Sequence, residues 1–373
     1  MRTPSKTALI SGSSIAGPAL AFWLNRHGFF TTVVERAPEL RSGGQAIDVR
    51  GVALDVIERM GLLDQVRALR TRLRGMSILD IDGREIERSE ERTLSGGRFD
   101  SGDIELFRDD LADLLYQSTR DTTKYVFGDT IAALDDRDAT VHVIFASGRQ
   151  QEFDLVIGAD GLRSTVRRLV FGDDVAFLRH LGAHLAIFST PNNLGLQDWQ
   201  LSFGNEKGGC LVFPTRDNAE LRVFLGFATD GPDIGRLDLA AQKQWVAERC
   251  GWMGGPMSTL LQGLAAAPDL YLGPIAQIHM PCWSKGRVTL VGDAAYCASP
   301  KSGQGTSLAI VGAYVLAEEL AKHIHDHRSA LQAYDRRMRP FVEINQALAT
   351  DSPDRPPPDE SLDRAKRAIA LDE

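Results

Sequence analysis

Three small residues near the N-terminus have the spacing of a phosphate-binding turn. Gly12-x-Ser14-x-x-Gly17 lies between an apolar run, Ala8–Ser11, and a stretch of helix formers, Ala16–Arg26. In a strand–turn–helix unit the first glycine permits a tight turn and the last lets helix and strand approach closely. The free N–H groups at the helix N-terminus then bind a pyrophosphate. Ser14 replaces the second glycine of the usual fingerprint, but it is small enough to leave room for phosphates.

A carboxylate follows at the distance such a unit requires. The segment Thr31–Arg36 predicts a second buried strand, and Glu35 near its end lies about 20 residues after Gly12, where an acid would bind ribose hydroxyls. Arg2 and Lys6 before an uncharged stretch also resemble a secretory signal. Cleavage of such a signal would remove the first strand of the unit, so we favour nucleotide binding.

Two further motifs follow predicted strands. The strand Phe153–Gly161 ends in an Asp-Gly pair with a serine and an arginine beyond it, and the strand Val288–Val291 runs into a second Gly-Asp pair. A proline, a Gly-Gln-Gly turn and a long helix follow the second pair. The motif residues are Asp160-Gly161-x-x-Ser164-x-x-Arg167 and then Gly292-Asp293, Pro300 and Gly303-Gln304-Gly305.

The composition excludes several classes of function. The net charge is -8 and no Lys/Arg cluster occurs, which argues against a nucleic-acid partner. Four well-separated cysteines without C-x-x-C, and eight histidines without H-E-x-x-H, favour no metal site and no disulfide framework. A reduced, cytoplasmic setting is expected. No stretch has the roughly 20 apolar residues of a membrane span, so we predict a soluble protein without stable membrane association.

The pattern of elements predicts an α/β fold. At 373 residues the chain is long enough for two domains or for one domain with an insertion. Residues 1–174 and 279–350 are predicted to form a discontinuous, Rossmann-like domain with helices near its C-terminal end. Residues 175–278, with alternating segments such as "CLVFPT" and "LRVFLGF", are predicted to form an inserted antiparallel-sheet domain that binds substrate. The tail 351–373 contains a proline-rich linker and a stretch that could form a short helix, and we expect it to be mobile or loosely docked.

Individual helices and strands are also predicted. Ala53–Leu69 and Ile104–Gln117 have apolar residues near helical spacing, and Leu239–Arg249 is helix-like. Met76–Arg88 is polar and contains the turn "DIDGRE", which predicts a hairpin.

Taken in order, the three motifs resemble those of class A FAD-dependent monooxygenases, the aromatic-hydroxylase-like flavoenzymes. The resemblance covers nearly the whole chain. Within that family the chain is most similar to the tetracycline-inactivating flavin monooxygenases. The stretches that carry this closer similarity are "GGQAIDVRG", "PNNLGL", "WSKGRVTLVGDAAYCASPKSGQG" and "VGAYVLAEEL".

The resemblance implies roles for individual residues. Glu35 would hold the adenosine ribose, Asp293 would bind the ribityl chain, and the backbone of Gly303–Gly305 would approach the isoalloxazine. The Asp160–Arg167 stretch would serve FAD and the transient nicotinamide. The implied cofactor-binding residues are Gly12, Ser14, Gly17, Glu35, Arg36, Arg41, Arg108, Asp160, Asp293, Gly303 and Gly305.

The sequence departs from the family at two positions. Ser307 stands where many relatives have Asn, and Gly312 stands where many have Asp. The contacts around the flavin loop are therefore expected to differ locally.

The resemblance also implies a reaction. NADPH or NADH would reduce bound FAD, oxygen would add to give a C4a-hydroperoxide, and the distal oxygen would hydroxylate an electron-rich enol or phenol. No second glycine-rich βαβ unit occurs, which is consistent with a nicotinamide that only visits the protein. No side chain is assigned as catalytic. His184, Phe213 and Phe224 are the candidates for contact with an aromatic or polycyclic substrate.

Three functions remain open. The substrate could be tetracycline, which would make the protein an antibiotic-inactivating enzyme, or another aromatic polyketide or phenolic metabolite. The third alternative is a flavoprotein that oxygenates nothing, either a reductase or a protein that sequesters a ligand. The protein is expected to be a monomer or a weak homodimer.

Overall fold

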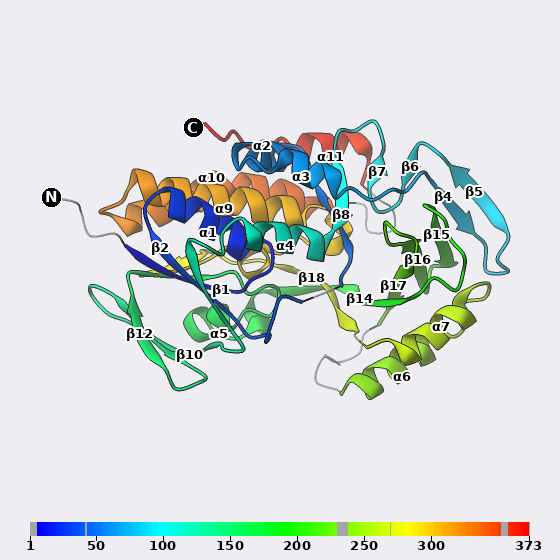
Figure 1. Cartoon of the computed structure of the whole chain (residues 1–373), viewed down its shortest axis with the longest axis horizontal. Coiled ribbons are helices and arrows are strands. Elements are labelled where there is room, and N and C mark those ends of the chain that lie inside the picture. The colour runs from blue at the N-terminus through cyan, green and yellow to red at the C-terminus, as the bar shows by residue number, and fades with distance from the viewer. Residues whose placement is uncertain (1–5, 42, 230–237, 269, 352–356, 373) are drawn as a thin grey trace.

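A six-stranded sheet forms the first layer of the fold (Figure 1). The structure is a computed structural model that describes residues 6–41, 43–229, 238–268, 270–351 and 357–372. The strand order is β19-β20-β13-β1-β2-β9, and all neighbouring strands are parallel except β19 and β20. The strands are β1 (Thr7–Ser11), β2 (Phe30–Glu35), β9 (Thr123–Phe127), β13 (Leu155–Gly158), β19 (Ser284–Lys285) and β20 (Val288–Leu290). The inner strands β1, β13 and β20 are short, mostly apolar runs buried on both faces, as expected for a parallel sheet.

Helices cover this sheet and complete the larger hydrophobic core. Helix α9 packs against α1, α2 and α10, and Figure 1 shows this helical layer lying along one side of the sheet. Leu20 of α1 and Ile310 of α9 are fully buried in the core between helices and sheet. The helices are α1 (Ala16–Arg26), α2 (Val52–Arg59), α3 (Leu63–Ala68), α4 (Arg108–Gln117), α5 (Thr165–Phe171), α8 (Asp293–Tyr296), α9 (Gly305–Lys322), α10 (His327–Ala347) and α11 (Asp359–Ala365).

A seven-stranded sheet with its own core forms the second body of the fold. Its order is β18-β14-β17-β16-β15-β4-β5, and every pair is antiparallel except β15 with β4. Helices α6 (Leu239–Cys250) and α7 (Met257–Ala266) cover one face and enclose the second core. The strands are β4 (Met76–Leu79), β5 (Glu85–Ser89), β14 (Leu178–Pro191), β15 (Gln200–Asn205), β16 (Gly208–Pro214), β17 (Glu220–Ala228) and β18 (Tyr271–Ile278).

Three small sheets complete the architecture. A three-stranded meander lies beside the parallel sheet, and two ribbons lie between the two larger bodies. Their strands are β10 (Ile131–Asp136), β11 (Val141–Phe145) and β12 (Gln150–Phe153), then β3 (Ala46–Val49) with β8 (Ile104–Phe107), and β6 (Arg92–Thr93) with β7 (Gly97–Arg98). Single turns of 3₁₀-helix lie at Asp174–Ala176 and Pro300–Ser302.

The predicted fold class is confirmed, but two predicted helices are wrong in part. The segment Ile104–Gln117 is not one helix, because Ile104–Phe107 forms strand β8 paired with β3, and α4 begins only at Arg108. The stretch Ala53–Leu69 is interrupted at Gly61, whose φ of 75° is incompatible with a continuous helix. Pattern alone does not distinguish a short apolar strand that leads into a helix from the helix itself.

The seven-stranded sheet also extends beyond the predicted range. The hairpin predicted for Met76–Arg88 is present as β4 and β5, and it joins the sheet through the parallel β15–β4 pair. Strands from well before residue 175 therefore contribute to this body. The boundaries at residues 174/175 and 278/279 remain a proposal.

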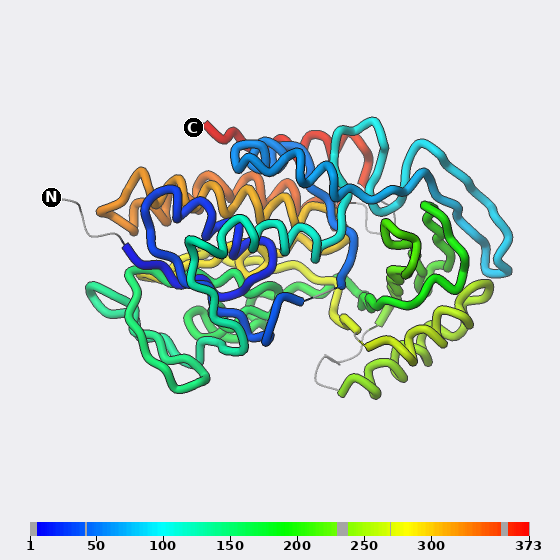
Figure 2. Tube along the Cα trace, viewed as in Figure 1, coloured from blue at the N-terminus to red at the C-terminus, as the bar shows by residue number. Residues whose placement is uncertain are grey.

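The C-terminal segment is docked, which overturns the predicted loose attachment for residues 357–372. Lys366 is 2% exposed, and its Nζ lies 3.1 Å from Asp103 Oδ2. The Asn345 side chain donates to the carbonyl of Ala365 at 3.1 Å, and the Val52 N–H donates to the carbonyl of Lys366 at 3.1 Å. Figure 2 shows this red end of the trace lying against blue residues of α2. Residues 352–356 and 373 of the predicted tail lie outside the described residues.

Candidate functional site: a nucleotide cradle facing a polar sheet

The first motif forms a tight turn at the carboxyl end of the central strand β1. Gly12 has a φ of 109°, and a Cβ there would lie 2.5 Å from the carbonyl oxygen of Ala159. A Cβ on Gly17 would collide with the carbonyl oxygen of Gly12. Helix α1 begins just beyond, with no side-chain cap and no acidic residue in its first turn, while Ser14 is half-buried. The backbone therefore leaves N–H groups of α1 available to an anion.

Glu35 lies beside this turn, as its position in the sequence predicts. Its carboxylate is 7% exposed, and it accepts hydrogen bonds from the N–H of Ser13 at 2.9 Å and of Ala37 at 3.0 Å. These two bonds fix the carboxylate at the end of β2, where hydroxyl groups of a nucleotide could donate to its remaining lone pairs. Arg36, the next residue, is exposed.

Arg108 at the start of α4 lies against the loop that contains Arg41. The guanidinium of Arg108 donates to the carbonyls of Arg41 at 2.9 Å and of Gly43 at 2.6 Å. Burial, and then the positive charge of Arg41, lower the pKa of Arg108. A Cβ on Gly44 would lie 2.6 Å from Arg108 Nε, so only glycine fits there. The positive charges of Arg41 and Arg108 act on each other, so an anionic group beside them would be favoured.

The Asp160–Arg167 stretch is saturated by contacts within the protein. Asp160 accepts hydrogen bonds from the Ser164 hydroxyl at 2.5 Å and from the Thr165 N–H at 2.8 Å, which caps helix α5. Arg167 is fully buried, pairs with Asp174 at 2.6 Å and donates to the carbonyl of Ala294 at 2.8 Å. This geometry favours a supporting role, in which the stretch fixes α5 and α8, over direct contact with a cofactor.

Asp293 and the Gly303–Gly305 turn come together as the third motif predicts. A Cβ on Gly305 would lie 3.8 Å from Asp293 Oδ1, and Gly303 has a left-handed φ of 62°. The Asp293 side chain opens to solvent at the start of the otherwise buried helix α8, and the surrounding protein raises its pKa by desolvation. Helix α9 begins at Gly305 with no side-chain cap and no acid in its first turn. Its free N–H groups suit an electron-rich acceptor.

The two departures from the family pattern have structural explanations. The Ser307 hydroxyl accepts a hydrogen bond from the N–H of Arg50 at 3.0 Å, which joins α9 to the end of β3. A Cβ at Gly312 would collide with the hydroxyl of Tyr296, so glycine makes room for that buried ring under α9.

The three predicted substrate residues lie on opposite faces of the seven-stranded sheet. Along β17, Leu221, Val223, Leu225 and Phe227 belong to the core under α6 and α7, so the intervening residues face the other way. Phe224 lies on that opposite face and packs against Phe213, with ring centroids 5.4 Å apart. His184 instead packs against Trp245 of α6, with ring centroids 5.9 Å apart.

The face of Phe213 and Phe224 is directed toward the nucleotide-binding body. The Phe213 ring stacks on Phe107 at the end of β8, immediately before Arg108, with centroids 6.3 Å apart. Arg222 on the same face lies over the ring of Phe107 at 5.6 Å. This placement favours Phe213 and Phe224 over His184 as substrate contacts.

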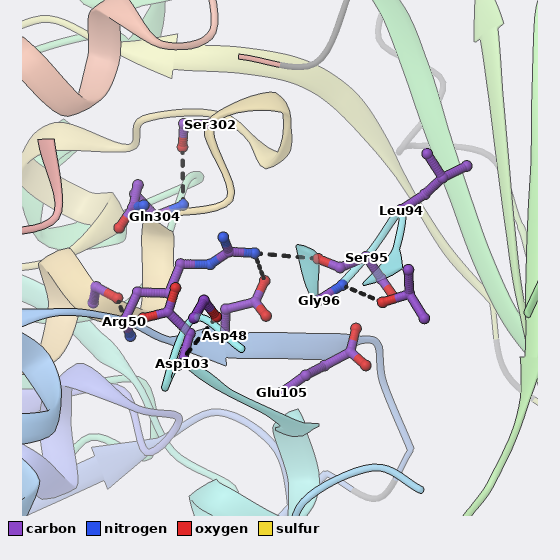
Figure 3. Close-up of polar contacts among 12 residues, drawn as sticks. Asp48, Arg50, Leu94, Ser95, Gly96, Asp103, Glu105, Ser302 and Gln304 are labelled. Carbon is purple, nitrogen blue, oxygen red and sulfur yellow. Dashed lines mark hydrogen bonds and ion pairs between the residues drawn. The ribbon is translucent and has the colours of Figure 1, made fainter. Parts of the chain in front are cut away.

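Several site residues were not singled out by the sequence analysis. Figure 3 shows Arg50 reaching Asp48 and the loop Leu94–Gly96, with Gln304 above Arg50 in the view. The side chain of Gln304 is fully buried, and neither its amide oxygen nor its amide nitrogen has a hydrogen-bond partner among the described residues. Gln200 of β15 donates to the Ser95 hydroxyl at 2.5 Å, which links the sheet to the same loop. Such unsatisfied buried groups are expected where a ligand supplies the missing partners.

Tyr271, at the start of β18, is another residue that the sequence did not reveal. Its side chain is 50% exposed, yet surrounding protein atoms raise its pKa to about 12, with Cys297 and Asp293 acting in the same direction. It therefore lies near Asp293.

No helix within the described residues is both long and apolar enough to cross a membrane. Among the same residues, no three His, Cys, Asp or Glu side chains gather as a metal-binding group.

The arrangement fits FAD. The site contains the groups that FAD needs. They are uncapped helix N-termini and arginines for the phosphates, a carboxylate for the ribose, and a glycine turn with an unsatisfied glutamine for the flavin ring. The sequence matches the model of the FAD binding domain family over residues 5–234 and 272–348. The chain belongs to this family.

Individual relatives refine the class. An uncharacterized protein of Mycobacterium tuberculosis is 47% identical over 368 residues, which cover 98% of this chain and 99% of that protein. A flavin-dependent monooxygenase from an unknown prokaryotic organism is 42% identical over 347 residues, covering 92% and 88%. The crystal structure of the tetracycline destructase Tet(55) matches with a TM-score of 0.89 and 35% identity, covering 100% of each chain. The chain is a FAD-dependent monooxygenase of class A, similar to the tetracycline destructases.

Proposed function

We propose that the protein hydroxylates a polycyclic enol or phenol, with tetracycline as the first candidate substrate, and that NADPH or NADH is its transient reductant. The observation that carries this proposal is the sheet face that is turned toward the nucleotide-binding body. It combines the rings of Phe213 and Phe224, which pack against each other at a tilt, with the guanidinium of Arg222. A flat, electron-rich ring system with an ionisable enol has the matching shape and charge.

The protein groups would bind and orient the reactants. Glu35, Arg41 and Arg108 would hold the adenosine and phosphate end of FAD, while Asp293 and the Gly303–Gly305 turn would hold its ribityl and ring end. The bound flavin would supply the oxygen-activating chemistry. The hydroperoxide route remains a prediction. Arg222 and the aromatic pair would hold the substrate and limit access of water to the reacting atoms.

The similarity to Tet(55) supports tetracycline as the candidate, because both chains align over their full lengths. Another aromatic polyketide or phenol would use the same aromatic and cationic groups. A cytoplasmic location and a monomeric or weakly dimeric state remain predictions.

The test is reductant consumption by the FAD-loaded protein with and without tetracycline, together with mass spectrometry of the product. Tetracycline-stimulated turnover and a product heavier by one oxygen would support the drug-oxidising function. Unstimulated turnover with intact tetracycline would move the proposal to a panel of polyketide phenols. Peroxide release without product from the whole panel would favour a non-oxygenating flavoprotein.

A further inference from the structure

Two buried carboxylates lie directly opposite each other in the β3–β8 ribbon. Asp48 and Glu105 are cross-strand partners, so their side chains share one face, and they are 9% and 7% exposed. Like charges in this position repel each other, and burial makes the repulsion stronger. Arg50 forms an ion pair with Asp48 at 2.8 Å. Among the described residues, no cation forms an ion pair with Glu105, whose Oε2 accepts a hydrogen bond from the Thr71 hydroxyl at 2.8 Å.

A third buried acid makes the cluster more negative than its cations can balance. Asp103, 5% exposed, pairs with Lys366 at 3.1 Å and accepts a hydrogen bond from the N–H of Gly51. Arg70 is exposed and donates to the main-chain carbonyl of Asp103. Three buried carboxylates therefore face two buried cations. The charged groups around Glu105 are Asp48 on β3, Arg50 beyond it, Asp103 before β8, Lys366 after α11 and Arg70 at the rim. Asp363 of α11 also pairs with Lys366, at 2.6 Å, but it is exposed to solvent.

A single proton on Glu105 balances the three buried carboxylates against the two buried cations. Asp48 forms an ion pair with Arg50, and Asp103 forms one with Lys366, so Glu105 is the acid without a cation. Burial also raises the pKa of Asp48, and its pairing with Arg50 opposes that rise. Burial, and then the negative charge of Asp48, raise the pKa of Glu105 to about 7, while Ser95, Thr71 and Arg50 act in the opposite direction.

The same cluster holds the loop that joins the two bodies. Arg50 Nη2 donates to the carbonyl of Ser95 at 3.3 Å, and a Cβ on Gly96 would lie 3.1 Å from Glu105 Cδ. Arg50 also lies against the Gly303–Gly305 turn, since a Cβ on Gly303 would be 3.8 Å from the Nη2 atom of Arg50. Gln200 holds the loop from the side of the sheet, through the Ser95 hydroxyl at 2.5 Å.

We propose that Glu105 is a positioning residue of the FAD site, which as a neutral acid leaves Arg50 bound to Asp48 and to the Ser95 carbonyl. Once Glu105 loses its proton, a second carboxylate competes for the same guanidinium and draws it away from Ser95 and from the Gly303 turn. The inference rests on the proposed position of the flavin ring at Gly303–Gly305. It predicts that FAD binding weakens as the pH rises through neutrality.

The first test detects the proton itself in FAD-free protein. Infrared spectroscopy over a pH titration should show the carbonyl band of a buried carboxylic acid that disappears with a midpoint near pH 7, and that is missing from E105Q at every pH. The variant D48N should lower the midpoint, because it removes a repelling charge, and T71V should raise it, because it removes a hydrogen bond to the carboxylate. These opposite shifts, measured with Glu105 still present, keep the proposal testable if E105Q does not fold.

The second test measures the consequence for the cofactor. The dissociation constant of FAD should rise about tenfold above neutral pH in the natural protein, as expected if binding and protonation are coupled by one pKa unit. It should stay flat across the same range in E105Q. A carboxylic-acid band that survives in E105Q, or an FAD affinity with the same pH dependence in both proteins, would overturn the proposal. Neither readout involves substrate, so a failure to oxidise tetracycline would leave this inference standing and would count only against the proposed substrate.

Discussion

The nucleotide-binding body and the seven-stranded sheet position their functional residues in different ways. In the first body the site is made of backbone turns, where Gly12 and Gly17 have no room for a side chain because carbonyl oxygens occupy the space. In the sheet the site is made by alternation, so that Arg222 and Phe224 face one way and Val223 and Leu225 face the other. The first kind of site is visible as a sequence motif. The second requires knowledge of which face is covered.

The largest effect should come from the backbone-built site. In G12A the new methyl group would lie 2.5 Å from the carbonyl oxygen of Ala159 at a φ of 109°. We expect the protein to lose FAD and about 3 kcal/mol or more of unfolding free energy, since main-chain atoms cannot move aside. FAD content and urea unfolding measure both quantities.

Gly28 supplies a matched control for that change. Its φ is 81°, but no atom lies within 4 Å of an added Cβ. G28A should therefore cost only the backbone strain, about 1–2 kcal/mol, and should keep its FAD. Equal losses in both variants would contradict the view that close packing defines the turn.

The next prediction tests whether Glu105, in the β3–β8 ribbon between the two bodies, is protonated in the folded protein below about pH 7. The pKa of Glu105 is raised from its ordinary 4.5 to about 7 in the folded protein. As the pH rises, the unfolded chain releases this proton first, so folding stability falls between pH 4.5 and pH 7. The natural protein should lose about 3 kcal/mol relative to E105Q across that window. Urea unfolding at several pH values measures the difference, and parallel curves would show that Glu105 ionises normally.

A smaller effect probes the packing of α9 in the first body. G312A would place a methyl group against the hydroxyl of Tyr296 and should cost about 2 kcal/mol. Adding Y296F removes that hydroxyl and should restore part of the loss, although it also removes the hydrogen bond from Tyr334. Thermal unfolding of the two single variants and the double variant measures the coupling. Strictly additive losses would contradict a direct clash.

The smallest expected change in free energy comes from a variant that tests which face of the seven-stranded sheet binds substrate. R222M removes the cation from the face directed toward the nucleotide-binding body and should raise the KM for an enolic substrate about tenfold without loss of FAD. F227L, on the face covered by α6 and α7, should lower stability and leave KM unchanged. If F227L changed KM as strongly as R222M, the assignment of the two faces would be wrong.

The sequence predicted the fold class and the motif-built half of the site because glycine turns and strand ends are local features. Gly12, Gly17 and Glu35 come together through residues adjacent in the chain or in neighbouring strands. The strand β8 was missed because Ile104–Phe107 runs directly into the helix that starts at Arg108, and only its pairing with β3 makes it a strand.

The remaining site residues depend on contacts between distant parts of the chain. Arg50, Ser95 and Gln200 meet only after the ribbon β3–β8 and the sheet have formed. The docking of the tail likewise depends on Lys366 finding Asp103 across most of the chain length. Neither contact leaves a periodic or local signal.

The central claim is that the two differently built regions form one oxygenating site. The most direct test supplies FAD, NADPH and isotopically labelled molecular oxygen, with tetracycline and then with a panel of polyketide phenols, and determines the product mass for the natural protein and for R222M. The account predicts one labelled oxygen atom in the product of the natural protein and much less product from R222M at low substrate concentration. Reductant oxidation that releases only peroxide, with every substrate recovered unlabelled, would contradict it.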